Sequence, residues 1–291
     1  MRRLLLAIVP ILLTPSVLLF GEPSSPRWHF ITNEHLRVGV DLNAGACIGW
    51  ISTTAEPDKN LLNTYDRGRY LQQSYYGDPD GSDWNGKPWR YNPVQGGDWR
   101  NQPSEILKFE PLSPNSLQVK TQPRHWATGK KLEDVVLSQT VTLKDDLLHV
   151  QFEIDTTSAI THKPYHQELP ALFVQPEYDT LLHAEKTDAP LTRTQPGQAN
   201  TYIALPERWV AWTNPHGHAI AILSPKSDQA TCYRAPIVPG TQAGCSYVAP
   251  IATLPITPNF TFQYEIWLGV GKVDSLRAKF RLLMQKTPAQ R

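Results

Sequence analysis

Apolar and polar residues alternate at every second position along much of this chain, which is the pattern of β-strands with one buried face. The first two such segments span residues 35–42 and 46–53, and the turn residues 43–45 between them predict a hairpin. Four further alternating segments lie between residues 104 and 157, with a turn predicted at residues 145–146. Long antiparallel strands of this kind bury one face against a core.

The second half of the chain continues with shorter alternating segments and one loop. Residues 210–214 and 218–225 flank a Pro-His-Gly turn signal. Two longer strands are predicted from 246 to 256 and from 260 to 271. Residues 186–208 are polar and rich in Pro and Gln, and we expect an excursion loop there.

One helix is predicted, over residues 274–286, with Asp274 as a candidate N-cap. Its apolar face is formed by Leu276, Phe280, Leu283 and Met284. Strands and helices do not alternate as in βαβ units, so the sequence predicts an all-β fold, a large antiparallel β-sandwich with this C-terminal helix. We expect a single domain over residues 26–291.

The stretch from Tyr65 to Ser104 interrupts the strand pattern and concentrates aromatic and charged residues. Its glycines and prolines break every period, so we expect mostly loop. Disordered segments are poor in aromatics, and loops this long in a compact domain are often functional. Aromatic faces beside carboxylates, amides and guanidinium groups suit a sugar, whose C–H face stacks on rings while its hydroxyls need donors and acceptors. We therefore predict a carbohydrate site; the alternative is a surface loop pinned by its own aromatic residues.

Composition narrows the range of functions. The chain has 291 residues and a net charge of +1, and no basic stripe favours nucleic acid as a partner. Two arginines followed by an apolar run from Leu4 to Phe20 predict a signal peptide over residues 1–21, and therefore export to the periplasm or the extracellular space. An uncleaved anchor is the alternative, although Pro10 and Pro15 oppose a stable spanning helix.

Three cysteines follow the predicted signal peptide. Because an exported chain meets an oxidising compartment, we expect a local disulfide between Cys232 and Cys245. Cys47 stands alone in an apolar strand and is expected to be a free, buried side chain. The spacings of cysteines and histidines do not support a zinc site.

The strongest candidate for chemistry is the segment that carries His162, Tyr165, His166 and Glu168. His166 and Glu168 are two residues apart, so on an extended strand both side chains share one face. A histidine beside a carboxylate can transfer protons near neutral pH. We predict His166 as the general acid or base and Glu168 as its orienting or carboxylate partner; a structural His–Glu hydrogen bond is the alternative.

Three further groups could take part. Asp98 follows two glycines among aromatics, which predicts either a catalytic carboxylate or a turn-capping aspartate. Arg67 and Arg69 could point together and bind a uronic acid or a sulfated sugar, or could be a solvated pair. The acidic segment 78–83 could cradle Ca²⁺, although its spacing does not match an EF-hand loop. Otherwise we predict no cofactor and no metal site.

The early Gly-Ala-Cys-Ile-Gly-Trp turn, the long aromatic loop, the mid-chain histidine segment and the late Gln-Tyr-Glu strand together resemble the galactose-mutarotase-like supersandwich. This fold is shared by sugar epimerases and by domains of several polysaccharide lyases and glycoside hydrolases. The resemblance covers the layout of nearly the whole chain after the signal peptide. In the mutarotase pattern, His166 would correspond to the histidine and Glu265 to the catalytic glutamate, whereas an Asn-His-x-Tyr-Phe string is absent. The resemblance implies a sugar-processing fold and leaves the reaction open.

These features predict an exported carbohydrate-active protein whose cleft combines the 65–104 loop with the 162–168 segment. Catalysis would rest on His166, Glu168 and Asp98. The sugar would be held by Arg69, Tyr75, Gln95, Trp89 and Trp99. The alternative is a non-catalytic glycan-binding or surface-structural β-sandwich in which the aromatics only stack on a glycan. Epimerisation, elimination and hydrolysis all remain open at this point.

Overall fold

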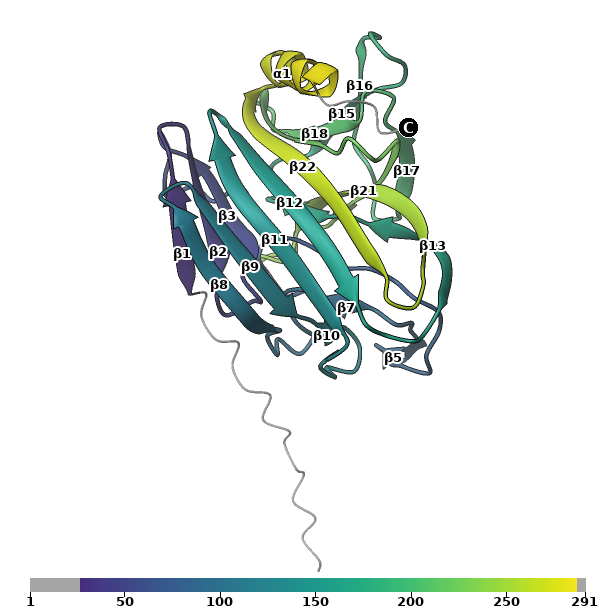
Figure 1. Cartoon of the computed structure of the whole chain (residues 1–291). Helices are drawn as coiled ribbons and strands as arrows, with labels where there is room; N and C mark the ends of the chain where they lie inside the picture. Colours follow the sequence, from purple (N-terminus) through teal and green to yellow (C-terminus); the bar gives the residue numbers. More distant parts are fainter. Residues whose placement is uncertain (1–26, 287–291) are drawn as a thin grey trace, which may run out of the picture.

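The computed structural model describes residues 27–286, and in this part of the chain two large antiparallel sheets face each other (Figure 1). Sheet I has the order β1 (Trp28–Thr32), β2 (Leu36–Asp41), β3 (Cys47–Thr53), β4 (Leu71–Gln72), β14 (Ala171–Val174), β21 (Cys245–Ile256), β20 (Gln229–Ala235) and β17 (Thr201–Ala204), and β13 (His162–Glu168) also pairs with β21. Sheet II has the order β16 (Leu191–Thr194), β15 (Thr180–Ala184), β18 (Trp209–Thr213), β19 (His218–Leu223), β22 (Thr261–Lys272), β12 (Leu147–Thr156), β11 (Val135–Lys144), β9 (Ser116–Gln122) and β8 (Glu105–Ser113). The predicted all-β sandwich is therefore confirmed.

The core lies between the two sheets and follows directly from the alternation in the sequence. In β11, the side chains of Val135, Leu137, Gln139, Val141 and Leu143 are buried, while the residues that alternate with them are partly exposed. Leu137 has no exposed surface, and truncating such a leucine to alanine costs about 2–5 kcal/mol. The predicted hairpins form as β2–β3 and β11–β12, and Asp145 takes the left-handed conformation that a tight turn requires.

The long aromatic loop is mostly irregular, as predicted, and holds only two-residue strands. Besides β4, these are β5 (Asp83–Trp84), paired with β6 (Lys87–Pro88), and β7 (Pro93–Val94), paired with β10 (Arg124–His125). The prediction of a strandless excursion over residues 186–208 is wrong, because β16 and β17 form there as edge strands of the two sheets. Both are short and largely exposed, so they lack the alternation that a buried strand shows.

Helix α1 (Val273–Lys286) follows β22 and packs on the outside of sheet II (Figure 1). It begins one residue before the predicted helix, so Asp274 lies in its first turn. Leu276 and Phe280 are buried against Trp209 and other residues of sheet II. None of the helical residues between 27 and 286 forms a segment long and apolar enough to cross a membrane. The predicted signal peptide lies outside the described residues.

The predicted disulfide between Cys232 and Cys245 is wrong, because all three cysteines are free thiols. In the β20–β21 pairing, Cys232 stands opposite Val248 and Cys245 stands opposite Ala235. This offset of three positions puts the two thiols on opposite faces of sheet I, one in the core and one on the outer face. Cys47 is fully buried, as predicted.

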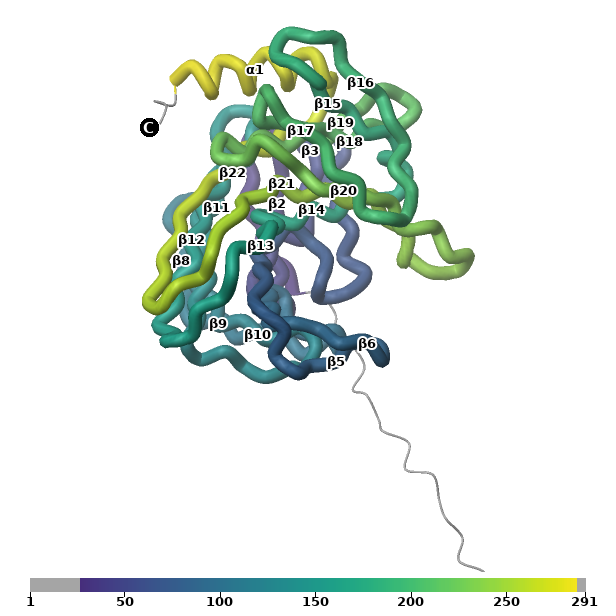
Figure 2. The backbone as a smooth tube through the Cα atoms, turned by 90° about the vertical axis from the view of Figure 1, so that its right-hand side faces the viewer, coloured from purple at the N-terminus to yellow at the C-terminus, as the bar shows by residue number. Residues whose placement is uncertain are grey.

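Strands β21 and β22 follow one another but diverge into different sheets. The second half of β21 pairs with β13, and Figure 2 shows these two strands side by side. Strand β19 pairs with β22 only from Trp267 to Lys272, which leaves the first half of β22 without a partner on that edge. This divergence creates a large hollow between β21 and β22, and β13 on the outer face of sheet I borders a smaller one.

Candidate functional site

The smaller hollow, of about 480 Å³, lies on the outer face of sheet I and has the size typical of small-molecule sites. It is lined by Tyr76, Trp89, Arg90, Pro164, Tyr165, His166, Glu168, Asn200, Tyr202, Thr231 and Ile251. These residues come from β13, β17, β20, β21 and the aromatic loop. We call this hollow the outer-face pocket.

Strand β13 supplies the two groups that the sequence singled out. His166 stands opposite Thr253 and Glu168 stands opposite Ile251, so both side chains share the outer face of sheet I. Their positions are about 6.6 Å apart along the strand. Gln167, between them, points inward and fixes the aromatic loop, because it accepts a hydrogen bond from the Tyr76 amide at 2.7 Å and donates one to the Tyr76 carbonyl at 2.8 Å.

Glu168 is partly buried, and its side chain lies among tyrosines. The Tyr76 hydroxyl donates a hydrogen bond of 3.1 Å to its carboxylate, and the Tyr247 hydroxyl lies beside the same carboxylate without a hydrogen bond of standard geometry. Burial raises the pKa of Glu168 above its usual value, and the two hydroxyls only partly offset that rise. A carboxyl group with a raised pKa is suited to hold and release a proton near neutral pH.

The pocket lining also contains a positively charged side chain, that of Arg90. Its guanidinium carbon lies 5.0 Å from the ring centre of Tyr165 and 6.0 Å from that of Tyr76. The Tyr165 hydroxyl in turn donates to Asp78 at 2.8 Å, which holds this ring in place. Two ordered aromatic rings thus position one cation at the pocket.

His166 and Tyr202 form the exposed rim. Their ring centres are 5.6 Å apart in an edge-to-face arrangement, and Tyr202 is 57% exposed. Tyr202 was missed from the sequence because it lies in β17, within the segment expected to be a loop. Tyr76 and Arg90 were visible in the aromatic loop, but no signal separated them from the other tyrosines and arginines there.

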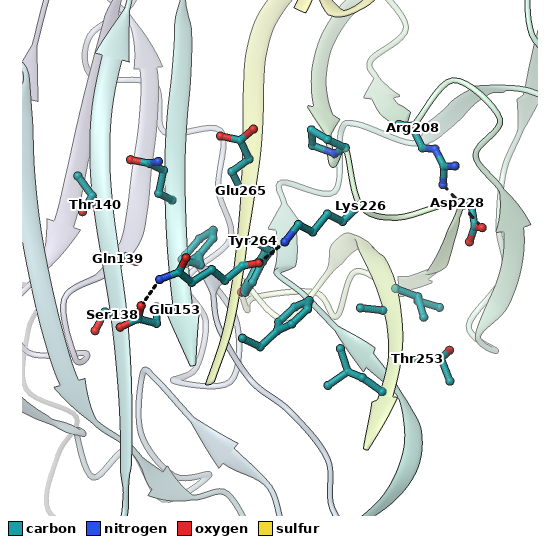
Figure 3. A pocket seen from close by; sticks show the side chains of 18 of the residues that line it. Ser138, Gln139, Thr140, Glu153, Arg208, Lys226, Asp228, Thr253, Tyr264 and Glu265 are labelled. Carbon is teal, nitrogen blue, oxygen red and sulfur yellow. Dashed lines mark hydrogen bonds and ion pairs between the residues drawn. The ribbon is translucent and has the colours of Figure 1, made fainter. Parts of the chain in front are cut away.

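The larger hollow, of about 1410 Å³, opens between β21 and β22 (Figure 3). Figure 3 shows Lys226 reaching toward β22, where its ammonium group donates to the Gln263 carbonyl at 2.6 Å. Glu153 accepts a hydrogen bond from the Gln263 side chain at 2.5 Å, and Arg208 pairs with Asp228 at 3.7 Å. The charged groups labelled in this view are therefore already engaged within the protein.

Glu265, which the resemblance matched to a catalytic glutamate, belongs to this larger hollow and not to the pocket with His166. It stands on β22 in sheet II, and its carboxylate contacts His149 at 2.7 Å. Trp267 stacks on the His149 ring at 4.0 Å, and burial lowers the pKa of that histidine. The match of Glu265 and His166 to a single site is therefore wrong.

The expectation that all the predicted residues converge on one pocket is also wrong for five of them, and three of these five are buried elsewhere in the fold. Asp98 is fully buried and accepts hydrogen bonds from the amides of Arg100 and Gln102, so it caps a turn. Tyr75 is buried in the core between the sheets. Gln95 has no exposed surface and holds backbone groups of Gly45 and Gln73. Sequence spacing cannot distinguish these inward-facing polar residues from outward-facing ones.

Trp99 and the two arginines of the loop also lie outside the pocket lining. The Trp99 indole donates to the Ala127 carbonyl at 3.0 Å. Arg67 and Arg69 do not point together, because residues 65–70 do not form a strand. Arg67 is buried against Asp41, whereas Arg69 donates to Asn63 and pairs with Asp66. Of the predicted sugar-binding residues, Trp89 alone lines the pocket.

The acidic segment 78–83 does not gather into a calcium site. Asp78 accepts from Tyr165 and the Lys163 amide, Asp80 contacts His125 at 2.8 Å, and Asp83 caps the Gly86 amide. Within residues 27–286, the His, Cys, Asp and Glu side chains nowhere form a group of three that could hold a metal ion.

His162 contacts the aromatic loop and does not line the outer-face pocket. It accepts a hydrogen bond from the Asp78 amide at 3.1 Å and stacks on Tyr91 with ring centres 4.7 Å apart. Gly77 packs so tightly on this imidazole that an added Cβ would lie 2.7 Å from it. The contact ties the aromatic loop to the start of β13.

Known proteins resemble this chain in fold but not in sequence. No family model and no curated protein matches the sequence. Solved structures do match in fold. A galactose mutarotase-like protein from Lactobacillus casei ATCC 334 has a TM-score of 0.56 at 14% identity, over 84% of this chain and 100% of that chain. A candidate aldose 1-epimerase from Escherichia coli K12 has a TM-score of 0.55 at 13% identity, over 86% of this chain and 100% of that chain.

A galactose mutarotase-like protein from Clostridium acetobutylicum has a TM-score of 0.53 at 8% identity, over 86% of this chain and 96% of that chain. The chain therefore has the galactose-mutarotase-like fold, as the sequence resemblance implied. At identities this low, the similarity shows the fold alone and does not show the reaction.

Proposed function

We propose that this protein interconverts the anomers of a reducing sugar in the outer-face pocket, with Glu168 and His166 as the proton-transfer pair. The observation that carries the proposal is the carboxyl group of Glu168. It is set among tyrosines, its pKa is raised by burial, and it shares a strand face and a pocket with His166. The aldose-epimerase and mutarotase names of the structural neighbours point to the same class of reaction.

The chemistry needs one proton donor and one acceptor. One group removes the proton of the anomeric hydroxyl while the other protonates the ring oxygen, so the ring C–O bond breaks and an aldehyde forms. Rotation of the aldehyde and the reverse proton transfers close the ring as the other anomer, with no net gain or loss of atoms. Glu168, with its raised pKa, would donate the proton to the ring oxygen, and His166 would accept the hydroxyl proton.

The lining argues against glycoside hydrolysis. Hydrolysis by the common mechanisms uses two carboxyl groups separated by about 5–9.5 Å. Glu168 is the one acidic residue among the described residues that line the outer-face pocket. A single carboxyl with a histidine fits proton transfer to a sugar that opens and closes its own ring.

A second candidate is a glycan-binding protein without turnover. Tyr202, exposed at the rim, and Trp89 in the wall offer flat faces for stacking on a sugar. The two functions differ in one respect, because a binding protein needs the rings and hydrogen bonds but does not need Glu168 to carry a proton. Export of the protein remains part of the proposal and rests on the apolar run from Leu4 to Phe20.

The test is the rate of anomer exchange, followed by NMR on freshly dissolved sugars, with the spontaneous rate subtracted. Three variants are compared with the wild type: Glu168→Gln, His166→Asn and Glu265→Gln. Glu168→Gln keeps an acceptor for the Tyr76 hydroxyl but cannot exchange a proton. Glu265→Gln is the matched control, because Glu265 is a histidine-paired carboxylate in the other hollow.

We expect Glu168→Gln and His166→Asn to lower kcat by about 10²-fold or more, the usual contribution of a positioned acid or base. Glu265→Gln should retain the wild-type rate. Binding of the sugar by the wild type without any acceleration of anomer exchange would instead favour the glycan-binding protein. Loss of activity in Glu265→Gln alone would move the site to the larger hollow.

A further inference from the structure

We propose that the outer-face pocket selects a sugar that carries an anionic group, a carboxylate, sulfate or phosphate, and that Arg90 binds this group. The inference rests on the proposed function in one respect, that the pocket is the sugar site. It adds the substrate class, which neither the fold nor the pair of Glu168 and His166 determines.

Arg90 differs from Arg67 and Arg69 in having no acidic partner, and from Arg100 in lining the pocket. Arg67 pairs with Asp41 at 3.3 Å, and Arg69 pairs with Asp66 at 3.6 Å. Among residues 27–286, no ion pair or hydrogen bond is formed by the Arg90 guanidinium, although Arg90 lines a pocket. A cation in a hollow without a counter-ion is an open binding position for an anion.

The contacts of Arg90 fix its position without using its hydrogen-bond donors. Tyr165 and Tyr76 approach the guanidinium through their rings. Each ring is anchored through its hydroxyl, which donates to Asp78 in one case and to Glu168 in the other. Neither ring contact uses a guanidinium N–H group as a hydrogen-bond donor to an acid, so these N–H groups remain for a ligand. A guanidinium of this kind binds carboxylate, sulfate or phosphate oxygens in pairs.

The charges around the pocket support the same substrate class. Glu168 is the one carboxyl in the lining, and burial favours its neutral form. Asp78, the acid that holds the Tyr165 ring, has its oxygens occupied by the Tyr165 hydroxyl and the Lys163 amide. Arg90 therefore brings a permanent positive charge to the pocket, and no carboxylate within residues 27–286 forms an ion pair with it.

The experiment measures dissociation constants by calorimetry at low ionic strength for three pairs of sugars. D-Galacturonic acid is compared with D-galactose, D-glucuronic acid with D-glucose, and glucose 6-phosphate or glucose 6-sulfate with D-glucose. The pairs distinguish the possible sources of the anionic group. The proteins are the full-length wild type, Arg90→Gln, Arg90→Lys and the control Arg100→Gln. Arg100 lies in the same loop and also contacts a ring, that of Trp99 at 4.6 Å, but it is exposed and does not line the pocket.

We expect the wild type to bind at least one anionic sugar about 10-fold to 100-fold more tightly than its neutral counterpart, the range for a charged hydrogen-bonded pair. This ratio should fall toward one in Arg90→Gln, take an intermediate value in Arg90→Lys, and stay unchanged in Arg100→Gln. It should also shrink as salt is added.

Three results would overturn the inference. These are equal binding of neutral and anionic sugars by the wild type, no binding of any sugar, and an unchanged ratio in Arg90→Gln. The wild-type ratio does not depend on how any variant folds. Anomer exchange is measured separately, so selective binding of an anionic sugar without acceleration would refute the proposed reaction and leave the substrate class standing.

Discussion

Glu207 joins helix α1 to sheet II, and its replacement gives the best-defined energetic prediction. Its side chain is 5% exposed and accepts hydrogen bonds from Arg277 at 2.6 and 2.8 Å, from Arg281 at 3.0 Å and from the Trp209 indole at 3.0 Å. Burial opposes ionisation of this carboxyl, but the hydrogen bonds from Arg277, Trp209 and Arg281 outweigh it and lower the pKa of Glu207 to about 2.

The size of the effect follows from this pKa. A fall from the ordinary 4.5 to about 2 corresponds to about 3 kcal/mol in favour of the folded state at neutral pH. Arg281 is 42% exposed, so solvent screens part of that attraction, and we expect Glu207→Gln to lower the free energy of unfolding by about 2–3 kcal/mol. Because the folded pKa is the lower one, the stabilisation is present above pH 4.5 and is lost as the pH falls toward 2.

The assay is urea unfolding of wild type, Glu207→Gln and Glu185→Gln at pH 7 and near pH 3. Glu185 is an exposed carboxylate that accepts a hydrogen bond from the Thr192 hydroxyl, so it serves as a control for the loss of one charge. The difference between wild type and Glu207→Gln should shrink to less than about half near pH 3. Equal stability of the two proteins at pH 7 would refute the reasoning, as would a difference that does not change with pH.

Three further outcomes follow from the structure. Because burial raises the pKa of Glu168, its ionised form destabilises the fold, so Glu168→Gln should be more stable than the wild type at neutral pH, and this difference should vanish below pH 4.5, as thermal unfolding at both pH values would show. A loss of stability at pH 7 would contradict this. Non-reducing mass spectrometry should find Cys47, Cys232 and Cys245 as free thiols that iodoacetamide modifies only after unfolding; a Cys232–Cys245 bridge would show a different β20–β21 register. Trp89→Ala should weaken sugar binding by about 1–3 kcal/mol in calorimetry, and unchanged affinity would remove Trp89 from the wall of the site.

The sandwich could be predicted from the sequence because most of its strands show a local alternation of apolar and polar residues. Residues 135–144 alternate strictly, and every second one faces the other sheet. Strand β17 carries no such signal, since an edge strand has little buried surface. The face on which a cysteine lies depends on the register between β20 and β21, and a one-residue shift of that register reverses it. The hydrogen-bonded pairing of the two strands sets this register, and the sequence spacing of Cys232 and Cys245 does not predict it.

The site could be predicted only where two residues share one strand. His166 and Glu168 are two apart on β13, so the alternation that predicts the strand also predicts their common face. Asp98 lies in an irregular loop, where nothing local decides between a turn cap and a free carboxylate. Arg90 and Tyr202 reach the pocket from a loop and from an edge strand, and only the folded chain brings them together.

The most direct measurement for the central claim is a crystal structure of the protein soaked with a reducing sugar, D-galacturonic acid and D-galactose being tried in turn. We predict a sugar ring in the outer-face pocket, with its ring oxygen or anomeric oxygen within about 3.2 Å of the Glu168 carboxyl. Its apolar side should face Tyr202 or Trp89, and any anionic group should contact Arg90. A sugar bound instead in the larger hollow, against Phe262 and Tyr264 of β22, would contradict the account.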